Sequence, residues 1–257
     1  MSVIDAFNLK GKTAFITGGS EGIGKAIALA LAEAGAALVI NYFNDHDKAN
    51  ETLREIEHMG AECHLFCLDI AEPQMPQRVK KFLDDSQLSI DILILNASVQ
   101  LRNTLENISA EEFDMQVNTN FKATLFLIQA LYPEMKRKGW GRILTIGSIQ
   151  QVRPHEHLIT YAATKSAQMN LVKNLAAQVA SSGVTINNLA PGAIATKRNY
   201  EVLQNAGYKK LVESKIPLGF VGESSDCAPM ALLLCSQAGR YITGQDIFVD
   251  GGMSLLT

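Results

Sequence analysis

The sequence predicts an α/β protein, built on a Rossmann-type doubly wound parallel β-sheet of about seven strands with helices on both faces. Short apolar runs alternate along the chain with longer segments of helical period, which is typical of a parallel sheet. The runs are continuously apolar, as expected for strands that are buried on both faces. A length of 257 residues, with 47% hydrophobic and 19% charged residues, fits one large domain, and we expect residues 1–257 to form it.

The expected strands are the apolar runs at residues 13–17, 37–41, 63–69, 90–96, 142–148, 184–190 and 246–250. The expected helical segments begin at Lys25, Asp47, Met75, Ala110, Thr160 and Glu223. Residues 193–220 interrupt this alternation with a stretch of mixed charge that contains helical patches. Such an insertion after the carboxyl end of a strand is expected to be either a substrate lid or a surface excursion.

Charge and composition exclude several classes of partner. The net charge of −3 gives no electrostatic reason to expect nucleic acid or an anionic membrane. No apolar run approaches the roughly 20 residues that span a bilayer, and the N-terminus does not read as a signal peptide, so we expect a cytoplasmic protein. The four cysteines are scattered, and we expect them to be packing residues instead of disulfides or metal ligands.

A glycine-rich stretch, "TGGSEGIG" at residues 17–24, lies between the first expected strand and the first expected helix. At such a turn, backbone N–H groups and the helix N-terminus attract phosphate, and glycines let the backbone approach closely. Gly18, Gly22 and Gly24 have the spacing G-x3-G-x-G, which differs from the G-x-G-x-x-G fingerprint. Alone, the stretch fits either a dinucleotide-binding turn or an ordinary tight turn.

This turn resembles the cofactor turn of the short-chain dehydrogenase/reductase family, and further motifs similar to that family's follow in order. Residues 95–98, "LNAS", resemble its N-N-A-G, with Ser98 in place of the glycine. Ser148 and the "YAATK" of residues 161–165 resemble its S…Y-x3-K set. "PGAIAT" at residues 191–196 resembles its P-G-x3-T, and the ending "TGQDIFVDGG" is similar to its C-terminal strand. The resemblance covers essentially the whole chain.

The resemblance implies an NAD(P)-dependent oxidoreductase that interconverts a secondary alcohol and a ketone and needs no metal. Within it, Asp69 would meet the adenine and Asn96 would lie near the adenosine ribose. The cofactor-binding residues that the resemblance implies are spread over the motifs above: Gly18, Ser20, Glu21, Gly22, Ile23, Gly24, Tyr42, Asp69, Ile70, Asn96, Ala97, Tyr161, Lys165, Pro191, Gly192, Ile194 and Thr196.

Tyr161 and Lys165 are four residues apart and share one face of a helix. A nearby ammonium favours the phenolate, so we expect it to lower the pKa of Tyr161 from about 10 and suit the phenol to acid–base catalysis. By resemblance, Tyr161 passes the proton, Ser148 orients the substrate oxygen, and Lys165 also holds the nicotinamide ribose. Asn120, a better match than Asn118 to the family's fourth catalytic residue, would support a water-mediated proton path to Lys165.

The end of the second expected strand usually decides between NAD and NADP. An acidic residue there binds the ribose 2′-OH, and a basic residue accommodates the 2′-phosphate. This chain has Tyr42 and Phe43 at these positions, so neither rule is met. The Glu21 carboxylate would repel the phosphate, although His46 and Lys48 could compensate if the loop curled back. We expect NAD(H) or NADP(H), with a slight preference for NAD(H).

Residues 149–160, between Ser148 and Tyr161, are polar and are expected to line the substrate cleft. This polarity favours a sugar, polyol or sugar acid over a long acyl or steroid skeleton, whereas solvated loop residues are the alternative. Arg153 or Arg198 could pair with a carboxylate. The expected substrate contacts are Gln150, Arg153, His155 and Arg198.

Two other functions compete with this one. A 3-oxoacyl-(acyl-carrier-protein) reductase needs a basic docking patch, and residues 135–142, "MKRKGWGR", form either that patch or the solvated end of a helix. A non-catalytic NAD(P)-binding regulator would not need Ser148, Tyr161 and Lys165 together. The resemblance also implies a homotetramer that uses the C-terminal strand and the helix near residues 225–235, although the apolar tail could pack on its own core.

Overall fold

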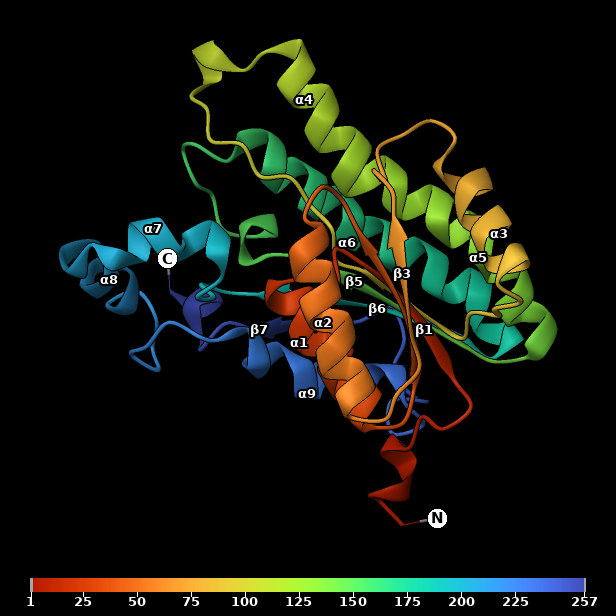
Figure 1. Cartoon of the computed structure of the whole chain (residues 1–257). Coiled ribbons are helices and arrows are strands. Elements are labelled where there is room, and N and C mark those ends of the chain that lie inside the picture. The colour runs from red at the N-terminus through yellow and green to blue at the C-terminus, as the bar shows by residue number, and fades with distance from the viewer. Residues whose placement is uncertain (1, 257) are drawn as a thin grey trace.

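The computed structural model describes residues 2–256, and at residues 201 and 202 it describes only the backbone. Seven parallel strands form one sheet in the order β3-β2-β1-β4-β5-β6-β7, which confirms the predicted doubly wound sheet (Figure 1). The strands are β1 (Thr13–Thr17), β2 (Ala37–Tyr42), β3 (Cys63–Cys67), β4 (Ile92–Leu95), β5 (Gly141–Ile146), β6 (Val184–Pro191) and β7 (Asp246–Val249).

Helices cover both faces of this sheet (Figure 1). One layer holds α1 (Gly22–Glu33), α2 (His46–His58) and α9 (Ser224–Cys235), and the other holds α3 (Met75–Asp85), α4 (Ala110–Val117), α5 (Ala123–Lys138) and α6 (Ile159–Val179). Successive strand residues enter opposite cores: Phe15 packs under the α5 layer and Ile16 under the α1 layer. Each strand therefore needs apolar residues on both faces, which explains its continuous apolar run.

Two segments depart from the simple alternation. The helical pattern expected from Ala110 is divided, because α4 ends at Val117 and a π-helical turn, Asn118–Lys122, precedes α5. The insertion after β6 contains two short helices, α7 (Lys197–Gln204) and α8 (Ala206–Glu213), which stand apart from both layers in Figure 1. No helix among residues 2–256 is long and apolar enough to cross a membrane.

The sheet places the polar motifs at one edge. The chain leaves β1 toward β2 and leaves β4 toward β5, so the strand order reverses between these two neighbours. In open parallel sheets, ligands bind outside the carboxyl ends of the strands at such a switch point. The glycine turn follows β1 and "NAS" follows β4, so both lie at this place.

Candidate active site

A pocket of about 490 Å³ lies at the carboxyl edge of the sheet. Its lining comes from the segments that follow β1, β2, β3, β4, β5 and β6, together with α6 and the start of α7. Every expected cofactor-binding residue lines it except Gly24. Volumes of 300–1,000 Å³ are typical of cofactor and small-ligand sites, so about 490 Å³ is ample for one.

The glycine turn has the geometry of a phosphate cradle. Gly18 and Gly22 have φ angles of +60° and +57°, a region that side chains disfavour. Gly24 supports the turn from behind, because a Cβ there would collide with the Gly18 carbonyl oxygen and lie 2.5 Å from Asn96 Nδ2. Asn96 Nδ2 donates to the carbonyl oxygens of Thr17 (3.1 Å) and Gly18 (2.9 Å). These contacts hold the turn open for the diphosphate of a nicotinamide dinucleotide, which the residues present fit.

At the glycine-turn end of the pocket, Glu21 and Tyr42 contact residues from the loop after β2 and the start of α2. Lys48 Nζ lies 2.7 Å from Glu21 Oε2 and 3.0 Å from Asp45 Oδ2, and Tyr42 Oη is hydrogen-bonded to His46 Nδ1 at 2.8 Å. Hydrogen bonding to Glu21 raises the pKa of Lys48, so Lys48 stays charged near neutral pH. The loop does curl back toward the glycine turn, and Glu21 is neutralised by Lys48.

Ser148, Tyr161 and Lys165 line the other end of the pocket together. Ser148 follows β5 and caps a 3-10 turn, Ile149–Gln151, where its Oγ accepts the Gln150 backbone N–H (3.1 Å). Tyr161 and Lys165 are one turn apart on α6, with Lys165 Nζ 5.7 Å from the phenol ring centre.

The electrostatics of this pair differ from the expectation. Burial raises the pKa of Tyr161 above its ordinary value, whereas Arg198 and hydrogen bonding to Ser148 act to lower it. Burial also lowers the pKa of Lys165 to about 7. The prediction that the Lys165 ammonium lowers the pKa of Tyr161 is therefore wrong for this structure, because burial outweighs it and the cation that opposes burial is Arg198.

Asn120 lies beside this pair without lining the pocket. It is buried on the π-helical turn, where Oδ1 accepts the Val99 N–H (2.8 Å) and Nδ2 donates to the Val99 carbonyl (2.8 Å) and to Thr164 Oγ1 (3.1 Å). The side chain thus ties the loop after β4 to α6. A water-mediated path from Asn120 to Lys165 stays a prediction.

Of the four expected substrate contacts, the structure brings only Arg198 to the pocket. Arg198 starts α7 and crosses to the loop after β4, where Nη2 donates to the Ser98 carbonyl (2.7 Å) and lies 3.2 Å from Ser98 Oγ. Arg153 instead donates to the Met253 carbonyl (3.0 Å), and His155 Nδ1 accepts the His157 N–H (3.1 Å). The turn after Ser148 directs the chain toward the C-terminal residues, away from the pocket. Gln150 and its neighbours therefore do not line it.

Sequence reasoning missed some of the pocket. Several missed residues directly flank expected ones near strand ends, so the sequence carried a signal for them: Asn41, Phe43, Leu68, Ala71 and Gly147. Ile146, the last residue of β5, precedes Gly147 and also lines the pocket. Met115 and Thr119 come from α4 and the π-helical turn, and no sequence pattern marks them. Among the side chains that the structure describes, which exclude those of residues 1, 201, 202 and 257, no three His, Cys, Asp or Glu are grouped to hold a metal ion.

A second missed feature is a polar network behind Ser148. Gln151 Nε2 and Asn188 Nδ2 donate to the two carboxylate oxygens of Asp246, at 2.6 and 2.7 Å. Asn188 Nδ2 also donates to Gln151 Oε1 (3.1 Å), which lies 3.4 Å from the Ser148 backbone nitrogen. The middle of β6 and the start of β7 are thereby tied to the turn that Ser148 caps.

Comparison with known proteins gives consistent results across the chain. A family model described as enoyl-(acyl carrier protein) reductase matches residues 18–254. The 3-oxoacyl-(acyl-carrier-protein) reductase FabG of Staphylococcus epidermidis is 34% identical over 242 residues, which cover 94% of this chain and 98% of that protein. The 3beta-hydroxysteroid dehydrogenase 1 of Eggerthella lenta is 33% identical over 252 residues, which cover 96% and 95%.

A solved structure matches over the full length. The gluconate 5-dehydrogenase of Burkholderia cenocepacia J2315, determined in complex with NADP and tartrate, superposes with a TM-score of 0.93. It is 32% identical, and the match covers 100% of each chain.

Proposed function

This chain belongs to the short-chain dehydrogenase/reductase family, and we propose that its substrate is a small hydroxy acid of the sugar-acid type. It is an NAD(P)-dependent oxidoreductase that acts on CH–OH groups. The observation that carries the substrate proposal is the Arg198 guanidinium, which lines the pocket together with Ser148 and Tyr161. A cation at this place favours a substrate with a carboxylate close to its reacting carbon.

The chain's own residues handle the proton. A nicotinamide bound in this pocket would supply or accept the hydride. In the reducing direction, Tyr161 donates its phenolic proton to the substrate oxygen, and the raised pKa keeps that proton in place at neutral pH. In the oxidising direction, the Tyr161 phenolate accepts the hydroxyl proton, and Arg198 and Ser148 stabilise that phenolate against the burial that disfavours it. Ser148 orients the same oxygen.

Arg198 suits a carboxylate better than a lysine would at this position. A guanidinium presents its N–H donors in a planar fork that matches a carboxylate in two parallel hydrogen bonds. Its measured contacts with Ser98 involve Nη2 only, which leaves other donors for a ligand. The related gluconate 5-dehydrogenase was solved with tartrate, a hydroxy acid, which supports this class of substrate.

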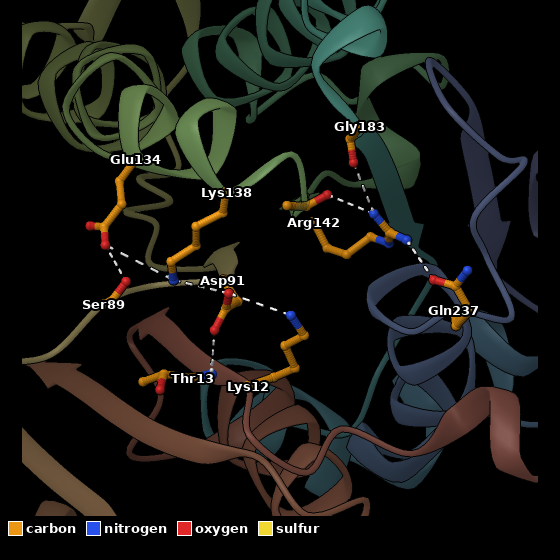
Figure 2. A network of polar contacts seen from close by, with 10 residues as sticks. Lys12, Thr13, Ser89, Asp91, Glu134, Lys138, Arg142, Gly183 and Gln237 are labelled. Atoms are coloured by element: carbon orange, nitrogen blue, oxygen red, sulfur yellow. Dashed lines mark hydrogen bonds and ion pairs between the residues drawn. The ribbon is translucent and has the colours of Figure 1, made fainter.

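The second candidate is a 3-oxoacyl-(acyl-carrier-protein) reductase, which the 34% identical relative favours. Its expected docking patch, residues 135–142, lies at the amino edge of the sheet, the edge opposite to the pocket. There Arg142 is only 3% exposed, and Lys138 Nζ is bonded to Asp91 (3.0 Å; Figure 2). This basic stretch therefore gives the acyl reductase no support beside the cleft.

For the cofactor we propose NADP(H), which revises the slight preference for NAD(H). Lys48 neutralises Glu21 at 2.7 Å, so Glu21 no longer stands as an unpaired negative charge against a 2′-phosphate. Lys197 also lines the pocket, and its charge adds to the hydrogen bonds from Lys48 that lower the pKa of Asp45. The NADP-bound relative is consistent with this proposal. A homotetramer and a cytoplasmic location stay predictions, and a monomeric mass in light scattering would exclude the former.

The deciding experiment is turnover of the purified protein on two panels, each with NADH, NADPH and their oxidised forms. One panel contains sugars, polyols and sugar acids, and the other contains 3-oxoacyl thioesters. We expect activity on the sugar acids, with the NADP pair preferred. Activity on the thioesters alone would identify an acyl reductase and overturn the proposal.

A further inference from the structure

The Lys165 ammonium is buried at the active site without a counter-ion. Its side chain is 2% exposed, and Nζ donates to the Ile146 carbonyl (2.7 Å) and to Gln168 Oε1 (3.2 Å). The charged group that faces it from α7 is Arg198, which is repulsive, and the titratable group on its own helix is Tyr161. Among the described side chains, none of the ion pairs within 4.0 Å includes Lys165 Nζ. Two neutral oxygen atoms therefore stabilise this charge.

Of these two acceptors, only Gln168 is a side chain. It is 1% exposed on α6, and its Nε2 donates to Thr124 Oγ1 on α5 (3.3 Å). The Thr124 hydroxyl donates in turn to the Asn120 carbonyl (3.0 Å). A hydroxyl has one proton to donate, and this one is committed to Asn120. Thr124 can therefore only accept from Gln168.

This arrangement fixes which end of the amide faces Lys165. The oxygen and nitrogen of a glutamine are distinguished by their hydrogen-bond partners. With its NH₂ group held by Thr124, Gln168 must turn its carbonyl oxygen toward the ammonium. The reverse orientation would place two donors against Lys165 and leave Thr124 without its donor, at a cost typical of buried unsatisfied polar groups.

We propose that Gln168 is a positioning residue for the reaction, which holds the protonated form of Lys165 in place through its carbonyl oxygen, with Thr124 setting the orientation of its amide. The inference rests on Lys165 acting in the proposed reaction beside Tyr161, as the family resemblance in the sequence implies, but it does not depend on the identity of the substrate. It also explains why a polar side chain occupies a fully buried position between α5 and α6.

The consequence is a dependence on pH that simple packing would not produce. Because the pKa of Lys165 is about 7, the group changes charge in the neutral range, and only the ammonium form needs the acceptor. The folded-state pKa is lower than the unfolded value, so stability rises with pH above about 7. Removal of Gln168 would lower the folded-state pKa further and penalise the folded protein most at low pH.

The test compares urea unfolding of the full chain at about pH 6 and about pH 9 for Gln168→Met, Gln168→Glu and Thr124→Val. We expect Gln168→Met to reduce the folding equilibrium constant about fivefold more at the lower pH, which is the effect at pH 6 of lowering the pKa of Lys165 by about one unit from about 7. Thr124→Val should also lose more stability at the lower pH, but by a smaller factor. Gln168→Glu places a carboxylate at the acceptor position, which should raise the pKa of Lys165. Its effect on stability should therefore be more favourable at the lower pH than at the higher pH.

Thr185→Val is the matched control. Thr185 is also buried, but its Oγ1 has no hydrogen-bond partner, and it lies on β6 at the amino edge of the sheet. We expect Thr185→Val to change the free energy of unfolding by the same amount at both pH values. An equal loss at both pH values for Gln168→Met would overturn the proposal and leave Gln168 as a packing residue. The unfolding measurement needs no substrate, so it stands or falls independently of the proposed reaction.

A kinetic readout then follows on whichever panel substrate is turned over. In the pH profile of kcat/KM, Gln168→Met should shift the limb that reports the Tyr161–Lys165 pair to lower pH by about one unit. Gln168→Glu should shift it in the opposite direction. Identical profiles for both variants and the wild type would contradict the proposed positioning role.

Discussion

The two edges of the sheet bury charge in opposite ways. At the amino edge, Asp91 is 5% exposed and is held by the Thr13 N–H (3.1 Å), by Lys138 Nζ (3.0 Å) and by Lys12 Nζ (3.7 Å; Figure 2). At the carboxyl edge, the Lys165 ammonium has only neutral acceptors. The buried carboxylate of the amino edge is thus paired with cations, whereas the buried ammonium beside the pocket has no carboxylate partner. A buried unpaired cation costs stability, so its persistence points to function.

Two buried cations, Arg142 and Lys165, differ in whether they can lose their charge. Arg142 at the amino edge also lacks a carboxylate, and its guanidinium donates to the carbonyl oxygens of Ser236 (3.1 Å), Gly141 (2.8 Å) and Gly183 (3.4 Å). Burial lowers the pKa of Arg142, yet a guanidinium remains charged at any ordinary pH. Lys165, by contrast, titrates near 7. The fold uses the permanent cation as a tie between segments and the titratable cation where a proton must move.

The largest expected effect is at the carboxyl edge, with Tyr161→Phe. Loss of the phenolic proton should lower kcat by about 10³-fold, within the range for a general acid–base residue. Cofactor binding, followed by fluorescence titration, should change little, because the ring and the pocket remain. The substitution removes only one hydroxyl, so the unfolding midpoint serves as the folding control. Retained turnover would refute the role assigned to Tyr161.

The next effect is at the amino edge and should be purely structural. Asp91→Ala removes the carboxylate shared by two lysines and a backbone N–H, so we expect the free energy of unfolding to fall by about 2–3 kcal/mol. The kinetic constants should stay unchanged once the protein is folded. Asp85→Ala, which breaks an exposed i,i+4 pair with Lys81, is the control and should leave the unfolding midpoint unchanged. A kinetic defect in Asp91→Ala would break the distinction between the edges.

A third prediction separates the two arginines that the sequence could not rank. Arg198→Gln should raise KM for sugar acids by about 10- to 100-fold, the value of one charge-assisted pairing, while neutral polyols change little. Arg153→Gln is the matched control, because Arg153 is bonded to the Met253 carbonyl and does not line the pocket. An equal rise in KM for sugar acids and for polyols in Arg198→Gln would show that Arg198 shapes the pocket without recognising a carboxylate.

The scaffold could be predicted from the sequence more fully than the details of the active site. The strands were predictable because each buried strand must be apolar on both faces, and the glycine turn because positive φ angles and close backbone contacts there require glycine. Arg153 and Arg198 could not be told apart, since the direction of the chain after Ser148 is set by tertiary contacts. Gln168 reads as an ordinary polar helix residue, and only the packing of α5 on α6 buries it. Local sequence patterns therefore predict the strands and the glycine turn, whereas the surroundings of a buried charge depend on how the helices pack on one another.

The smallest predicted effect concerns cofactor choice, at the outer end of the pocket. Lys48→Gln removes the partner of Glu21, so the carboxylate again faces the position of a 2′-phosphate unpaired. We expect the affinity for NADPH to fall about tenfold and that for NADH to change little, because only the former carries the extra phosphate. Lys25→Gln is the control, since Lys25 is paired with Glu55 (2.9 Å) and does not line the pocket. An equal loss for both cofactors would mean that the Glu21–Lys48 pair shapes the loop without reading the phosphate. In that case the Glu21–Lys48 pair would have a structural role only, like the Asp91–Lys138 pair at the amino edge.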